Sequence, residues 1–166
     1  MAGIVGLTEL QHTNGTSAAT IDASGRILTP ARPAFRVEKR ASNQTLSDST
    51  TTTITFEHEA FDIGSNYDTS TSRFTAPVAG IYHFNSITRA VTNGGTMDYF
   101  IMFLYKNGSL YSDMFQMQTS ANNMLNSHLG GSVTVQLAAT DYVEIRVAIS
   151  GTSPYVGSHS TGQRTW

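Results

Sequence analysis

One short segment restricts the fold more than any other part of the chain: an uninterrupted apolar and aromatic run from Tyr99 to Tyr105. Because side chains alternate between the two faces of a β-strand, both faces of this strand would be apolar. One face carries Phe100, Met102 and Leu104, and the other carries Tyr99, Ile101, Phe103 and Tyr105. A strand in a two-layer antiparallel fold meets the core on one side only. We therefore expect another subunit, or alternatively a loop, to cover the second face.

The rest of the chain also predicts strands and turns. Apolar and polar residues alternate over Val133–Leu137 and Val143–Ile149, which is typical of strands with one face on a core. Asn14-Gly15 and Asn107-Gly108 favour tight hairpins. No long stretch has helical spacing of apolar residues, and the best candidate, Ala121–Leu129, contains paired Asn residues that favour a loop. The sequence therefore predicts an all-β fold.

Composition excludes several classes of protein. Charged residues are 13% of the chain and the net charge is -2, which argues against binding along a nucleic acid backbone. The absence of cysteine excludes a disulfide scaffold. The longest apolar run is far shorter than the ~20 residues of a membrane-spanning helix, so no membrane insertion is expected. The N-terminus also lacks the basic region of a signal peptide.

Pro30 and Pro33 divide the chain into two parts, residues 1–33 and residues 34–166. The first part predicts three short strands with few apolar residues, followed by an extended connector. Such a small sheet is marginal alone, so it must pack on another copy of itself or on a partner protein. The second part has stronger strands and forms the main domain.

Residues 34–166 resemble the complement C1q and tumour necrosis factor superfamily. The signature of this superfamily combines spaced aromatic residues, an Asn or Asp, and a Gly-x-Tyr-x-Phe motif. The matching positions here are Phe56, Asp62, Tyr67, Phe74, Gly80, Tyr82 and Phe84. Ser86 replaces the final aromatic residue of the signature. Further similar segments are Pro33–Val37, Leu104–Gly108, Gly131–Leu137 and Asp141–Val143.

This resemblance implies a ten-strand jelly-roll sandwich that assembles as a homotrimer. It implies a final strand of the Phe-x-Gly-x-Leu type, and the sequence stops at Gln163–Trp166, where that strand should run. We therefore expect an incomplete last strand, an open sheet edge and a natural chain that continues past Trp166. The candidate residues for the core and the trimer interface are Tyr82, Phe84, Tyr99, Phe100, Ile101, Met102, Phe103, Leu104 and Tyr105.

The segment Leu10–Arg26 resembles structural fibre proteins of tailed bacteriophages, in which short β segments precede C1q-like tips. The two resemblances imply a non-enzymatic virion protein, a trimeric fibre or spike head that displays loops to a glycan or protein of the host surface. Residues 1–33 would attach it to other virion proteins. The alternatives are a capsid decoration protein, a cellular secreted C1q-like ligand and a glycan-cleaving fibre tip.

Catalytic and metal-binding patterns are weak. Glu57 and Glu59 would share one face of a strand, and paired carboxylates can hydrolyse glycosides, but such a pair is more often a solvated strand edge. The five histidines, His12, His58, His83, His128 and His159, lack the spacing of metal ligands. Asp62, Asp68 and Asp141 are the only candidates for calcium, without a dense acidic run. We expect no catalytic residue, cofactor or metal.

Overall fold

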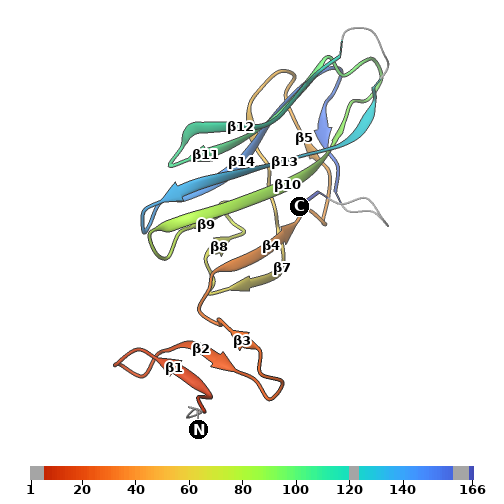
Figure 1. Ribbon diagram of the computed structural model, residues 1–166. Helices are drawn as coiled ribbons and strands as arrows, with labels where there is room; N and C mark the ends of the chain where they lie inside the picture. The colour runs from red at the N-terminus through yellow and green to blue at the C-terminus, as the bar shows by residue number, and fades with distance from the viewer. Residues whose placement is uncertain (1–5, 120–123, 159–164) are drawn as a thin grey trace.

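The computed structural model describes residues 6–119, 124–158 and 165–166, and within these ranges every regular element is a strand. The all-β prediction is therefore confirmed. Figure 1 shows a small N-terminal sheet joined by an extended connector to a larger β-sandwich. Within the described ranges, no helix has the length and apolar character needed to cross a membrane.

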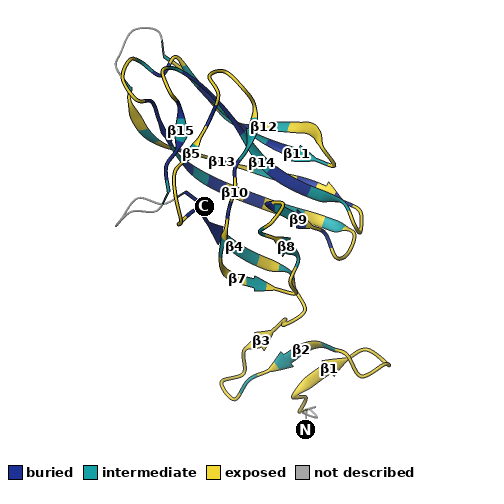
Figure 2. Cartoon of the chain, turned by 180° about the vertical axis from the view of Figure 1, so that it is seen from behind, coloured by how far each residue is buried: buried dark blue, intermediate teal, exposed yellow. Residues whose placement is uncertain are grey.

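The N-terminal sheet has three strands in the order β1-β2-β3, which are β1 (Glu9–Gln11), β2 (Ser17–Ile21) and β3 (Ile27–Leu28). Cross-strand pairs share a face, so the pairs Leu10–Ala19 and Ile21–Ile27 put four apolar residues on one side. Leu10 and Ile27 are 61% and 71% exposed. The sheet stands apart from the sandwich in both ribbon views (Figures 1 and 2) and leaves this apolar face uncovered.

The sandwich contains twelve strand segments in the described residues. They are β4 (Ala34–Glu38), β5 (Gln44–Thr45), β6 (Thr52–Thr53), β7 (His58–Ile63), β8 (Tyr67–Asp68), β9 (Arg73–Thr75), β10 (Gly80–Val91), β11 (Tyr99–Lys106), β12 (Ser109–Gln118), β13 (Asn126–Leu137), β14 (Tyr142–Ser150) and β15 (Tyr155–Val156). One sheet has the order β13-β10-β15-β5, and the other has the order β12-β11-β14-β9-β8, with β6 also paired to β14. β4 pairs with β7.

The core forms where the alternating apolar faces of the two sheets meet. β11 lies between β12 and β14 and contributes Phe100, Met102 and Leu104, all 0% exposed. The facing sheet contributes the inward residues of β10 and β13, including Phe84 and Val135. The predicted hairpin between β11 and β12 is present, with positive φ at Asn107 (50°) and Gly108 (78°), the left-handed conformations that favour Asn and Gly.

The two sides of the sandwich are closed differently. On one side β13 approaches β12 so closely that a Cβ at Gly131 would lie 2.2 Å from the carbonyl oxygen of Met114. On the other side the end of the chain lies between β10 and β4: Ile87 N–H donates to Trp166 O (2.7 Å) and Lys39 N–H donates to Thr165 O (3.1 Å). Among the described residues, β4 pairs only with β7, and β10 pairs with β13 and β15 (Figure 1).

Candidate interaction surfaces

The two faces of β11 have different surroundings. The Phe100, Met102 and Leu104 face is the core face, a choice that the sequence left open. The opposite face carries Tyr99, Ile101, Phe103 and Tyr105, which are all half-buried in the single chain. We call these four residues the outer β11 face. No loop of the described chain buries them completely, so they remain a candidate contact surface.

A charged network covers part of the outer β11 face. The side chain of Glu144 is only 2% exposed and accepts hydrogen bonds from Arg73 Nε (3.0 Å) and Arg146 Nε (2.9 Å). The guanidinium of Arg146 lies 4.1 Å from the ring centre of Tyr105, and that of Arg73 lies 4.2 Å from the ring centre of Tyr142. Glu144 thus holds two arginines flat on two aromatic rings. The surface is an aromatic and guanidinium strip rather than a bare apolar face.

The electrostatics of this network follow from its geometry. Burial raises the pKa of Glu144, but the hydrogen bonds from Arg146 and Arg73 outweigh burial, so the pKa lies below its ordinary value. The pKa of Arg73 is raised by the same hydrogen bond to Glu144. Glu144 and Arg73 therefore stay charged at neutral pH. Two guanidinium groups face one carboxylate, so the network has one positive charge in excess.

Tyr82 and Phe84, the other two candidates for the core and the trimer interface, lie on β10, in the sheet opposite β11. They belong to an aromatic cluster with Phe74, whose ring centre is 5.6 Å from that of Tyr82 and 5.5 Å from that of Phe84. Phe35 of β4 stacks on Phe74 at 4.9 Å. Three aromatic residues of the superfamily signature, Phe74, Tyr82 and Phe84, thus pack together with Phe35, which joins β9 and β10 to β4.

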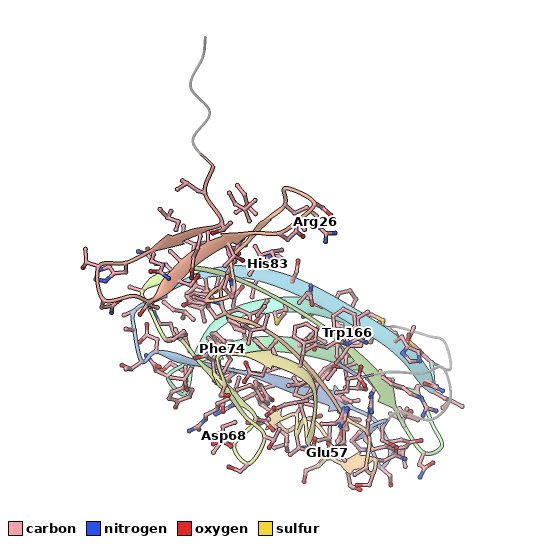
Figure 3. The ribbon with its side chains drawn as sticks, turned by 90° about the horizontal axis from the view of Figure 1, so that it is seen from below. Arg26, Glu57, Asp68, Phe74, His83 and Trp166 are labelled. Atoms are coloured by element: carbon pink, nitrogen blue, oxygen red, sulfur yellow. The ribbon has the colours of Figure 1, made fainter. Side chains whose placement is uncertain are left out.

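This aromatic cluster forms the floor of a groove of about 700 Å³ between β4 and β10. We call it the β4–β10 groove. It is lined by Phe35, Phe74 and Tyr82, by the exposed residues Val78 and Ile81, and at one end by Trp166. Figure 3 shows the labelled side chains of Phe74, His83 and Trp166, which mark the region of the groove.

The two glutamates considered for catalysis have different positions. Glu57 precedes β7, and its Oε1 accepts the backbone N–H groups of Arg40 and Ala41. These bonds lower its pKa despite the opposing effect of burial. Glu59 lies within β7 and is exposed. Glu57 therefore stabilises a backbone turn, and the two carboxylates do not share an enclosed pocket.

The candidate calcium ligands are also separate from one another. Asp62 accepts Tyr67 N–H (2.8 Å), Asp68 accepts the hydroxyl groups of Ser70 and Thr71, and Asp141 pairs with Lys106 (2.8 Å). In the described part of the chain, no three His, Asp or Glu side chains lie close enough to hold a metal ion. His159 lies outside the described residues. We identify no cofactor site from this arrangement.

Comparison with known proteins identifies the domain. The C1q domain family model matches residues 34–163, so the chain belongs to the C1q domain family. The globular domain of zebrafish complement 1qA has the same fold, with a TM-score of 0.54 and 17% identity over 75% of this chain and 92% of that domain. An insect tumour necrosis factor, Eiger from S. frugiperda, aligns with a TM-score of 0.45 and 11% identity over 80% of this chain and 99% of that protein.

One relative from bacteria is similar in sequence. The phage-like element PBSX protein XkdV of Bacillus subtilis (strain 168) is 40% identical over 88 residues, which is 50% of this chain. The matched region is 13% of XkdV, so the chain corresponds to a small part of that protein.

Sequence reasoning missed the Arg73, Glu144 and Arg146 network. The alternation over β14 predicts that Glu144 and Arg146 face outward beside Tyr142, but not that Glu144 becomes buried. Arg73 comes from β9 and reaches Glu144 only because β9 pairs with β14, so no local pattern could have identified it. Sequence reasoning also did not predict the aromatic floor of the groove.

Proposed function

We propose that this protein is a structural component of a phage or phage-like particle. In this proposal its C1q domain forms a homotrimeric head, and its polar loops contact a glycan or protein on the host surface. The protein acts by binding and assembly rather than by catalysis. Members of the C1q family generally serve as binding domains, and neither Glu57 nor Glu59 lies in an enclosed acidic site.

The observation that carries this proposal is the similarity to XkdV, a protein of a phage-like element. The C1q domain alone is compatible with a secreted cellular ligand, because the zebrafish complement domain has the same fold. A 40% identity to a phage-element protein favours the particle over the cellular alternative.

The uncovered face of the N-terminal sheet supports an attachment role for residues 1–33. Leu10 and Ile27 are largely exposed there, and an apolar face on such a small sheet gains stability only when another surface covers it. A second copy or another particle protein would supply that surface.

The outer β11 face supports self-association of the C1q domain. Three copies around an axis would bury the half-exposed rings of Phe103 and Tyr105 and close the symmetry. The Arg146 side chain on Tyr105 would then lie at the border of the contact.

Localisation on the particle tests the proposal. We expect antibody against the C1q domain to label assembled particles in electron micrographs at their tail or fibre ends. Labelling of the head shell would instead support a capsid decoration protein. One result would contradict a structural role. In that result, fully assembled particles carry no label while the same cells contain the free protein.

A further inference from the structure

The chain contains three Asn-Gly pairs, at Asn14-Gly15, Asn93-Gly94 and Asn107-Gly108. An asparagine followed by glycine is chemically labile, because glycine has no Cβ to hinder the approach of its own backbone nitrogen to the asparagine side chain. The attack requires a side-chain amide that can turn, a Gly N–H that is not hydrogen-bonded, and room for the backbone to rearrange. The three pairs have the same local sequence, but the structure surrounds them differently.

Asn107, in the hairpin between β11 and β12, is held by both ends of its side-chain amide. Its Nδ2 donates to Asp141 Oδ1 (2.7 Å), and its Oδ1 accepts the N–H of Tyr142 (2.9 Å). Asp141 is itself paired with Lys106 (2.8 Å). The side chain of Asn107 must give up two hydrogen bonds before it can react with Gly108, so this pair is protected.

Asn14, in the hairpin between β1 and β2, is exposed but also engaged. The N–H of Gly15 donates to His12 O (2.8 Å), so the attacking nitrogen is already bonded. The Oδ1 of Asn14 accepts the N–H of Thr16 (2.9 Å). Attack at Asn14 therefore also breaks hydrogen bonds of the turn.

Asn93, in the loop between β10 and β11, has no such restraints. Within the described residues, neither the side chain of Asn93 nor the N–H of Gly94 takes part in a hydrogen bond. Both residues are exposed, and a Cβ placed on Gly94 would meet nothing within 4 Å. Attack by the Gly94 nitrogen therefore breaks no hydrogen bond and displaces no packed neighbour.

The base of this loop is fixed although its tip is free. The N–H of Asn93 donates to Thr152 O (2.9 Å). A Cβ at Gly151 would lie 2.7 Å from Cγ2 of Thr92 and 2.8 Å from the carbonyl oxygen of Thr96, so the base packs closely on the end of β14. A chemical change at the tip therefore leaves the sandwich folded.

We propose that Asn93 is a site of spontaneous deamidation in the folded protein, while Asn14 and Asn107 are protected. The Gly94 nitrogen loses its proton to hydroxide and bonds to Cγ of Asn93, and the Nδ2 group leaves as ammonia. Water then opens the resulting five-membered imide at either carbonyl, which gives aspartate or isoaspartate. Each event adds one negative charge to the net charge of -2. This inference is independent of the proposed function.

The test compares the three pairs within one sample of the folded, full-length protein. The protein is incubated in mildly alkaline buffer, digested at acidic pH at successive times, and analysed by peptide mass spectrometry. We expect the Asn93 peptide to lose its amide at least about tenfold faster than the Asn107 peptide, because Asn107 must first lose two hydrogen bonds. An enzyme that methylates isoaspartate should label the same Asn93 peptide.

Two variants and one unfolded control separate structure from sequence. Asn93→Gln, at an exposed position, should abolish the acidic charge variant that accumulates in the wild type, because glutamine would have to close a larger ring. Asp141→Ala frees the amide nitrogen of Asn107 and should speed deamidation there while the rate at Asn93 stays unchanged. In concentrated urea the wild-type chain should lose its amides at similar rates at all three pairs.

Two results would overturn the proposal. The first is deamidation at Asn14 or Asn107 that is as fast as deamidation at Asn93 in the folded protein. The second is a preference for Asn93 that persists unchanged in urea, since the preference would then come from neighbouring residues in the sequence and not from the fold.

Discussion

At the scale of single residues, the most consequential group is the buried carboxylate of Glu144. Its side chain is 2% exposed, whereas Arg73 and Arg146 are 38% and 26% exposed. Burial of a carboxylate is unfavourable unless charged donors compensate for the lost water. The two arginines do so, and in return Glu144 fixes both guanidinium groups over Tyr142 and Tyr105.

We therefore predict that Glu144→Gln lowers the free energy of unfolding by about 1–3 kcal/mol at pH 7. The cost is smaller than for a fully enclosed ion pair because water partly screens the arginines. Urea denaturation followed by circular dichroism measures the change. Glu59→Gln is the control, because Glu59 is exposed and should change stability by less than about 0.5 kcal/mol.

The loss of stability caused by Glu144→Gln should depend on pH. Because the pKa of Glu144 is lower in the folded protein than its ordinary value of 4.5, its contribution is complete above pH 4.5. The contribution is lost as the pH falls through the folded pKa. The stability difference between wild type and Glu144→Gln should therefore shrink below about pH 4.5. A difference that grows in acid would show that the arginines do not hold the carboxylate charged.

At the scale of secondary structure, β11 is the element on which the sandwich is organised. It lies between β12 and β14, and its core face is completely buried. Its outer face is covered only in part, by Arg146 and by the contact between Phe103 and Tyr105, whose ring centres are 6.2 Å apart. Substitutions on the two faces should therefore act on different properties.

We predict that Phe100→Ala destabilises the subunit by about 3–5 kcal/mol, since it leaves a cavity in the core. Phe103→Ser with Tyr105→Ser should instead leave a folded domain that no longer forms trimers. Light scattering should then give a mass near the 17.9 kDa of one chain, while the wild type gives three times that mass.

Ile81→Ser is the comparison for the trimer contact, because Ile81 is 78% exposed on β10 in the opposite sheet. Its variant should keep the wild-type mass. If the trimer dissociates in the Ile81→Ser variant but not in the β11 variant, the trimer contact lies on the sheet that contains β10 and β13. A monomeric wild type that unfolds cooperatively would refute the trimer.

At the scale of the whole molecule, the two parts of the chain differ in how they are stabilised. The C1q domain has a continuous core between two sheets, whereas the N-terminal sheet leaves Leu10 and Ile27 in solvent. In Figure 2 exposed residues dominate the N-terminal sheet and buried residues follow the long strands of the sandwich. The N-terminal sheet should thus add little to the stability of the isolated protein.

Removal of residues 1–33 should accordingly leave a folded C1q domain, with a melting temperature within a few degrees of the full chain. The truncated protein should no longer join the particle, as measured by its absence from purified particles. A full-length variant with Leu10→Ser and Ile27→Ser should show the same loss. Normal incorporation of the truncated protein would contradict the attachment role.

Local patterns in the sequence determined the strands, the hairpins and the domain type. Alternation with a period of two set the faces of β13 and β14, and Asn107-Gly108 set a hairpin, because both signals depend only on neighbouring residues. The spacing of Phe56, Phe74 and Phe84 identified the C1q domain, since these rings are buried together in its core.

Only the tertiary structure decided which face of β11 is the core face, because both faces are apolar and periodicity cannot rank them. It also decided that Glu144 is buried, since its partner Arg73 is distant in sequence and arrives through the pairing of β9 with β14. The groove likewise exists because the tertiary structure brings Phe35 of β4 and Phe74 of β9 beside Tyr82 of β10. These features depend on contacts between segments that are far apart along the chain, and no local pattern encodes such contacts.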